Sequence, residues 1–158
     1  MKPFCARTFL LLFVTICAAV TAKAAVSCSV SGSGVAFGGY ESILNRDRDT
    51  SGTIFVTCSG TVGEAVNYSV SLNQGGGTLL GRTLSGGSDS LRYNLFTNVG
   101  RSQVWGNGSA GTFVVSDRYN LTASTTTRQY TVFGCIPAGQ RGIAANAYAD
   151  MITITLDY

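Results

Sequence analysis

Few residues of this 158-residue chain are suited to catalysis, because it contains no histidine. Without an imidazole, Ser–His and Cys–His pairs and histidine-ligated metal sites are excluded, which leaves carboxylates, tyrosine, arginine and thiols. The acidic residues occur singly, and no serine lies in a G-x-S-x-G motif. We therefore predict that the protein is not an enzyme.

The segment from Asp47 to Gly52 has the spacing of the start of a calcium-binding loop. The twelfth position of such a loop would be Cys58, whereas calcium needs a bidentate glutamate there. We interpret the segment as a solvated turn, and we predict no metal site and no cofactor.

Trp105 is the single tryptophan, and Gly106-Asn107-Gly108 follows it. Its indole could stack on a sugar, which would make the chain a carbohydrate-binding adhesin domain. A lone tryptophan beside a turn more often packs in the core or at its rim, and we favour that interpretation.

The first 25 residues have the organisation of a secretory signal peptide. Lys2 and Arg7 precede an apolar run that ends at Val20, and Ala22-Lys23-Ala24 provides an A-x-A cleavage pattern. The run has about a dozen residues, fewer than the ~20 that span a bilayer. We predict removal of residues 1–25, export through the periplasm to the cell surface, a pilus or the extracellular space, and no direct insertion into a membrane.

The formal net charge of +3 belongs to this signal segment. Its removal takes away Lys2, Arg7 and Lys23, which leaves eight arginines against eight acidic residues. These arginines are dispersed without a run, so the chain lacks the basic patch of a nucleic-acid-binding protein.

Three cysteines remain after residue 25: Cys28, Cys58 and Cys135. Three pairings are possible, and we favour Cys28 with Cys58 because each lies in a predicted strand and neighbouring strands bring Cβ atoms into bonding range. Closing this loop would contribute roughly 3–4 kcal/mol in the chain-entropy model. We interpret Cys135 as a buried small hydrophobe rather than as an intermolecular disulfide or a reactive thiol.

The remainder of the chain, residues 26–158, is predicted to form one all-β domain. No stretch of ten or more residues has helical apolar spacing, and glycine-rich segments separate runs rich in β-branched and aromatic residues. Such short strands indicate a β-sandwich. The predicted strands include residues 53–58, 66–72, 91–96, 112–115, 129–133 and 151–158.

The last predicted strand alternates up to the final residue. Ile152, Ile154, Leu156 and Tyr158 lie on one face, and threonine and aspartate lie on the other. Because domain ends fray unless they are held, this pattern indicates either a paired terminus or the last core strand of a self-contained sandwich.

The order of short motifs along the chain resembles the spore coat protein U family, whose members include Csu-type subunits of archaic chaperone–usher pili. The resemblance covers nearly all of residues 26–158. The motifs that carry it are Cys28, Val35–Tyr40, Cys58, Tyr68–Leu72, Arg82–Leu84, Leu91–Phe96, Trp105–Gly108, Tyr130–Gly134, Ile136–Gln140 and Tyr148–Asp150.

The resemblance implies an immunoglobulin-like β-sandwich that lacks its last strand and receives it from another protein. A periplasmic chaperone lends a strand, and an outer-membrane usher exchanges it for a strand of a neighbouring pilus subunit. The expected function is a structural pilus subunit for attachment and biofilm formation. Ile152, Ile154, Leu156 and Tyr158 would form the groove and the chaperone-docking edge, and a Cys28–Cys58 disulfide matches the family pattern.

One departure from the family concerns the donor extension. Cleavage after Ala24 would leave only Ala25-Val26-Ser27 before Cys28, too few residues to donate a strand. We therefore expect the chain to accept a strand without offering one, as a tip or initiating subunit would. A self-contained secreted spore-coat or matrix protein remains the alternative.

Overall fold

The computed structural model describes residues 25–158, so the predicted signal peptide lies outside the described residues except for Ala25. Within this part there is no helix, and thus none with the length and apolarity needed to cross a membrane. Nine strands confirm the all-β prediction: β1 (Ser27–Gly32), β2 (Arg48–Ser59), β3 (Ala65–Leu72), β4 (Gly77–Thr78), β5 (Gly81–Gly86), β6 (Asp89–Phe96), β7 (Val115–Asn120), β8 (Thr125–Ile136) and β9 (Ile154–Asp157).

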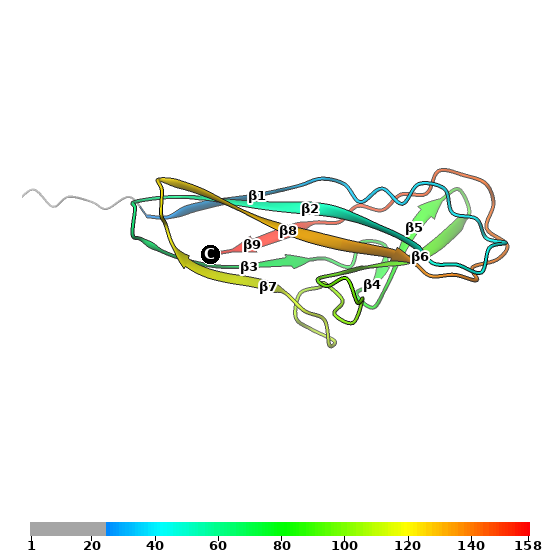
Figure 1. Ribbon diagram of the computed structural model, residues 1–158. Helices are drawn as coiled ribbons and strands as arrows, with labels where there is room; N and C mark the ends of the chain where they lie inside the picture. The colour runs from blue at the N-terminus through cyan, green and yellow to red at the C-terminus, as the bar shows by residue number, and fades with distance from the viewer. Residues whose placement is uncertain (1–24) are drawn as a thin grey trace, which may run out of the picture.

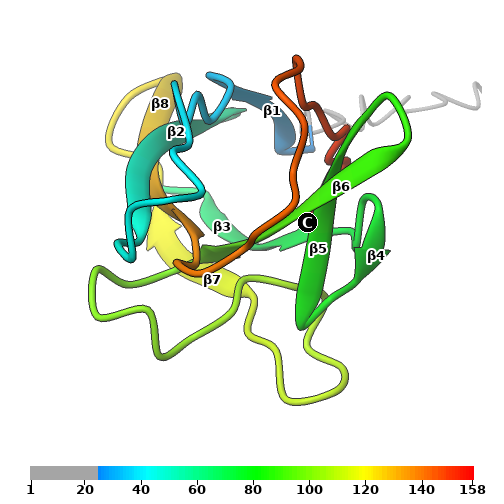
Figure 2. The ribbon, with the colours of Figure 1, turned by 90° about the vertical axis from the view of Figure 1, so that its right-hand side faces the viewer.

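The strands form two antiparallel sheets that pack face to face in an elongated sandwich (Figure 1). The larger sheet has the order β1-β2-β8-β6-β5-β4, and the smaller has the order β7-β3-β9. Viewed from one end, both sheets curl around a shared interior (Figure 2). The predicted β-sandwich is therefore confirmed.

The core follows from the period-two pattern of the central strands. In β3, Val66, Tyr68, Val70 and Leu72 are buried, and the intervening residues are less so. In β2 the buried set is Gly52, Ile54, Val56 and Cys58. Because alternate side chains of a strand point to opposite faces, each strand places one apolar face against the other sheet.

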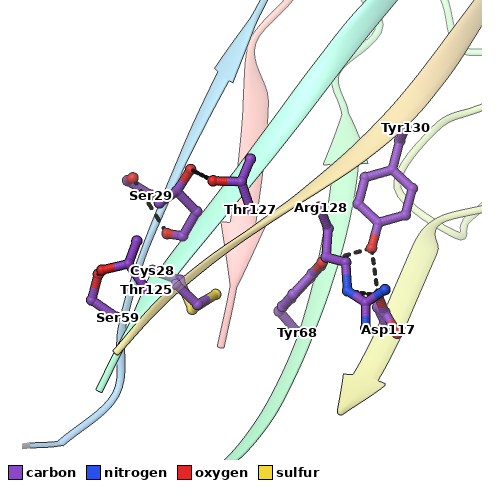
Figure 3. Close-up of a disulfide and its surroundings, with 11 residues drawn as sticks. Cys28, Ser29, Ser59, Tyr68, Asp117, Thr125, Thr127, Arg128 and Tyr130 are labelled. Carbon is purple, nitrogen blue, oxygen red and sulfur yellow. Dashed lines mark hydrogen bonds and ion pairs between the residues drawn. A yellow bond between two sulfur atoms is a disulfide. The ribbon is translucent and has the colours of Figure 1, made fainter. Parts of the chain in front are cut away.

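Hydrogen bonds between side chains join the two sheets along one side of the sandwich. Tyr130 of β8 donates a hydrogen bond to Asp117 Oδ2 of β7 (2.8 Å), and its hydroxyl lies 2.6 Å from that of Tyr68 on β3 (Figure 3). Burial raises the pKa of both tyrosines, so both hydroxyls stay protonated and can donate. These bonds join β8 of the larger sheet to β7 and β3 of the smaller one.

The favoured disulfide is present. Cys28 and Cys58 are opposite each other on β1 and β2, with Cα atoms 4.0 Å apart, and they are bonded through their sulfurs (Figure 3). The bond fastens the edge strand β1 to the sheet.

Buried Arg82 joins the two sheets near one end of the sandwich. Its side chain is 0% exposed, and Nε and Nη2 donate to the carbonyl oxygen of Asn73, just after β3, at 3.1 and 2.7 Å. Nη1 donates to Asn94 Oδ1 on β6 (2.6 Å), and Nη2 donates to the carbonyl oxygen of Trp105 (2.8 Å). Burial lowers the pKa of Arg82, because the interior disfavours its charge.

Two predicted strands differ from those observed. Residues 112–114 lie outside the strands, and β7 begins at Val115, because Phe113 exchanges main-chain hydrogen bonds with the loop at Val104 and Gly106 instead of with a sheet. The final strand covers only Ile154–Asp157, and Met151 is 84% exposed.

Candidate functional site

The edge strand β1 has an unpaired side. Among residues 25–158, β1 pairs only with β2, and the short Cα distance between Cys28 and Cys58 marks a pair that exchanges no main-chain hydrogen bonds. By alternation, the same holds for Val30 and Gly32. The main-chain N–H and C=O groups of these three residues therefore point away from β2.

The edge strand β9 is unpaired on the side facing β1. Within the described part of the chain β9 pairs only with β3, and the N–H of Asn73 donates to the carbonyl oxygen of Thr153 (3.1 Å). Thr153 and, by alternation, Thr155 bond toward β3. The main-chain groups of Ile152, Ile154 and Leu156 are consequently directed away from β3.

A cavity of ≈ 240 Å³ lies where these two edges approach each other. Its floor belongs to the core, since Leu72, Leu95 and Val132 line it and are at most 3% exposed. Its walls are formed by residues 32–35 and Phe37 on the β1 side and by Asp150, Ile152 and Ile154 on the β9 side.

A larger cleft of ≈ 880 Å³ continues the cavity beyond the strand ends. Residues 35–43 and 143–150 form its walls, and Leu84, Leu91 and Ile136 are also among its lining residues. Because Val35, Phe37, Leu84 and Asp150 line both spaces, the two form one continuous groove. We call it the edge groove.

Two glycines allow the first wall of the edge groove to pack closely against the larger sheet. A Cβ on Gly52 would lie 2.8 Å from Val35 Cγ2, and a Cβ on Gly134 would lie 2.8 Å from Val35 Cγ1 and 2.9 Å from Phe37 Cζ. Only glycine permits this close approach of residues 35–37 to β2 and β8. Arg48 Nε fixes the same segment by donating to the carbonyl oxygen of Phe37 (2.6 Å).

Hydrogen bonds to polar side chains hold the second wall of the edge groove in place. Asn73 Oδ1 accepts a hydrogen bond from the N–H of Thr153 (2.9 Å), and Asp150 Oδ1 accepts one from the N–H of Gly76 (2.8 Å). Ala149 exchanges two main-chain hydrogen bonds with Ser85 of β5. This wall thus crosses from the larger sheet to the smaller one before β9 begins.

The edge groove narrows between β1 and β9. Cα atoms of β1 and β9 come within 8 Å of each other, whereas a strand inserted between two others needs about 4.8 Å to each neighbour, or about 9.6 Å in all. An inserted strand must therefore move the two edges apart at this end, while the cleft end is already open.

The Spore Coat Protein U domain family matches residues 14–155, which is most of the chain. The chain belongs to this family. We call it the SCPU chain below. A search of curated proteins found no match.

Solved structures share the fold of the SCPU chain. One is the crystal structure of the CsuC–CsuE chaperone–tip adhesion subunit pre-assembly complex from archaic chaperone-usher Csu pili of Acinetobacter baumannii. The TM-score is 0.57 at 21% identity, and the match covers 84% of this chain and 40% of that one. This likeness supports the immunoglobulin-like fold.

Only two of the four residues predicted to form the groove line the cavity. Ile152 and Ile154 line the cavity, and Leu156 packs partly buried against the core. Tyr158 follows β9 and is 63% exposed. The sequence reasoning missed the opposite wall at residues 33–43, although the alternation of Val35 and Phe37 was a usable signal.

Trp105 is buried and is therefore not available as a ligand contact. Its side chain is 0% exposed, and its Nε1 donates to the carbonyl oxygen of Val70 (2.9 Å). An indole with no exposed face cannot stack on a sugar, so Trp105 has the core-packing role that the sequence favoured. The adhesin alternative loses its only sequence support.

The Asp47–Gly52 segment is not a turn, because Arg48–Gly52 belong to β2, and its two carboxylates share Arg101 as their cationic partner. Arg101 Nη1 lies 2.8 Å from both Asp47 Oδ2 and Asp49 Oδ1. The N–H of Ala138 and the Arg101 guanidinium lower the pKa of Asp47. Among residues 25–158, no group of three or more histidine, cysteine, aspartate or glutamate side chains is arranged to hold a metal ion.

The free thiol of Cys135 is expected to be unreactive. Cys135 is 7% exposed. Its burial and, to a lesser extent, the carboxylate of Asp49 raise its pKa from 9.0 to about 11, although Arg101 Nη1 lies 2.9 Å from its sulfur. The alkylation rate measured by mass spectrometry should therefore keep rising between pH 9 and pH 11.

Over the same range the unfolded thiol ionises first, so the contribution of Cys135 to stability should fall as pH rises.

The control for this experiment is the urea-unfolded chain, in which alkylation should level off above about pH 9. A native chain that shows the same plateau would contradict the assignment of Cys135 as a buried, protonated thiol.

Proposed function

We propose that the SCPU chain is a structural, non-enzymatic subunit of archaic chaperone–usher surface pili, and that the edge groove receives a β-strand from another protein. The observation that carries this proposal is the pair of unpaired edges, β1 and β9, beside a cavity that reaches the core. A strand placed there gains main-chain hydrogen bonds from the edges and pockets for alternate side chains. Without an occupant, such edges favour aggregation.

The family and the solved complex support the partners of this proposal. The family is that of the spore coat protein U domain, and the fold is shared with a complex of a chaperone and a tip adhesion subunit. The proposed partners are a periplasmic chaperone, an outer-membrane usher and neighbouring pilus subunits. Ile152, Ile154, Leu156 and Tyr158 are the proposed contacts on the β9 side.

We also propose a position at the tip or start of a filament, with a role in attachment and biofilm formation. The support is the predicted cleavage after Ala24, which leaves three residues before Cys28. Mass spectrometry of the exported protein tests this position, because an amino-terminus that leaves a dozen or more residues before Cys28 would contradict it.

A self-contained secreted coat or matrix protein is the second candidate. The close approach of β1 and β9 favours it, because their Cα atoms come within 8 Å of each other and leave too little room for a full strand between them. The two candidates differ in whether a separate strand stabilises the domain.

Thermal denaturation separates them. The disulfide-bonded mature chain, prepared from a periplasm, should melt at a rising temperature as a twelve-residue peptide of alternating valine and threonine is added. Binding to the native state alone stabilises it by about 2.7 kcal/mol at one hundred times Kd. A scrambled peptide of the same composition is the control. An unchanged melting temperature with every alternating peptide would contradict the strand-accepting function and favour the self-contained protein.

A further inference from the structure

One acidic side chain interrupts the apolar lining of the edge groove. The ≈ 240 Å³ cavity is lined mainly by aliphatic and aromatic residues and glycines, and Asp150 is the one acidic residue among them. Asp150 also lines the larger cleft, so it lies at the junction of the two parts of the groove. Any segment that occupies the whole groove passes this carboxylate.

The carboxylate of Asp150 is held in place by neutral donors. Oδ1 accepts hydrogen bonds from the N–H groups of Gly76 (2.8 Å) and Met151 (2.7 Å), and Oδ2 accepts one from the hydroxyl of Tyr93 (2.6 Å). Burial and this hydrogen bond raise the pKa of Tyr93, so the phenol remains a donor. The side chain is therefore preorganised rather than free to turn away from an incoming segment.

The charge of Asp150 has no ion-pair partner among residues 25–158. The ion pairs in this part of the chain join Arg101 to Asp47 and Asp49, and Arg128 to Asp117. The buried guanidinium of Arg82 bonds Asn73, Asn94 and Trp105 and forms no ion pair with Asp150, although the two charges attract each other through space. Asp150 is partly exposed at present, but a strand covering the groove would remove water from it, which is costly for an unpaired charge.

We propose that the segment docking in the edge groove carries one lysine or arginine among its inward-facing apolar residues, in register with Asp150. This rests on the proposed strand-accepting function and adds a charge requirement to it. The aliphatic stem of a lysine or arginine can pack along the apolar walls while its charged end reaches the carboxylate. The pair fixes the register of the strand, because a shift by two residues places the cation against apolar side chains.

The test is a scan of synthetic strand peptides. Each is the alternating valine–threonine dodecamer with one inward valine replaced by lysine or, as the uncharged counterpart, by methionine. Affinities are measured by fluorescence anisotropy at low and high salt with the mature chain, with Asp150→Asn and with Asp157→Asn. Asp157 is a matched control, because it is an exposed acid on β9 outside the cavity lining.

At one position the lysine peptide should bind the native chain about fivefold more tightly than the methionine peptide at low salt. This advantage should shrink at high salt and disappear in Asp150→Asn, but persist in Asp157→Asn. Salt dependence in the unmodified chain provides the readout if Asp150→Asn fails to fold.

Two failures are distinguishable. If the methionine peptides bind but lysine is never preferred, or is equally preferred in Asp150→Asn, the charge requirement is wrong while the strand-accepting function stands. If no peptide binds, the function itself is contradicted, and the charge requirement falls with it.

Discussion

Replacing Arg82 by methionine is expected to lower the free energy of unfolding by about 4–5 kcal/mol. The substitution leaves the carbonyl oxygens of Asn73 and Trp105 without a donor, and it leaves Asn94 Oδ1 with the N–H of Leu95 alone. An unsatisfied buried polar group costs about 1–3 kcal/mol, and removing the desolvated charge returns only part of that sum. Since domains are stable by about 5–15 kcal/mol, most of the margin would be lost.

Urea denaturation of the disulfide-bonded chain measures this loss. The matched control is Arg92→Met, because Arg92 lies on β6 beside the same region but is exposed. We expect the midpoint for Arg92→Met to stay close to that of the native chain. A similar midpoint for Arg82→Met would show that the guanidinium contributes no net stability.

The long strands could be predicted from the sequence because each has one buried face. From Gly52 in β2 and from Val66 in β3, every second residue is apolar and buried, so local alternation carries the information. The predicted strand at residues 112–115 was wrong because Phe113 bonds to the loop at Val104 and Gly106, which no local pattern encodes. The final strand was predicted too long for a similar reason, since distant residues hold its first half.

The candidate site was only half predictable. Ile152 and Ile154 belong to a visible alternation, and both line the cavity. Asp150 gave no local signal, because its partners Tyr93 and Gly76 are 57 and 74 residues away in the sequence. Its position in the edge groove depends on packing that brings three separate segments together.

The asymmetry of the sandwich explains where a strand can enter. On one side, Tyr130 and Asp117 hold β8 against β7 with a short hydrogen bond. On the other side, the free edges of β1 and β9 are directed toward each other with no sheet pairing between them. β4 and β7 are sheet edges as well, but only the edges of β1 and β9 lie beside a cavity that reaches the core, so an incoming strand can bury apolar side chains there.

Replacing Ile154 by aspartate is expected to weaken strand binding by more than about 100-fold. Ile154 lines the cavity and is only partly buried, so a carboxylate there stays hydrated while the groove is empty. A docked strand would cover that carboxylate with no cation aligned to it, and burying an unpaired charge opposes binding strongly. Fluorescence anisotropy with the alternating valine–threonine peptide measures the affinity, and a urea midpoint confirms that the variant is folded.

The opposite face of the same strand supplies the control. Thr155 is adjacent to Ile154 on β9 but is exposed, and its side chain points away from the cavity. Thr155→Asp adds the same charge to the same segment, so any general effect of negative charge on β9 would appear in both variants. Strand binding should survive in Thr155→Asp and be lost in Ile154→Asp. Equal losses would place the strand elsewhere than in the edge groove, because only a site inside the groove distinguishes the two faces of β9.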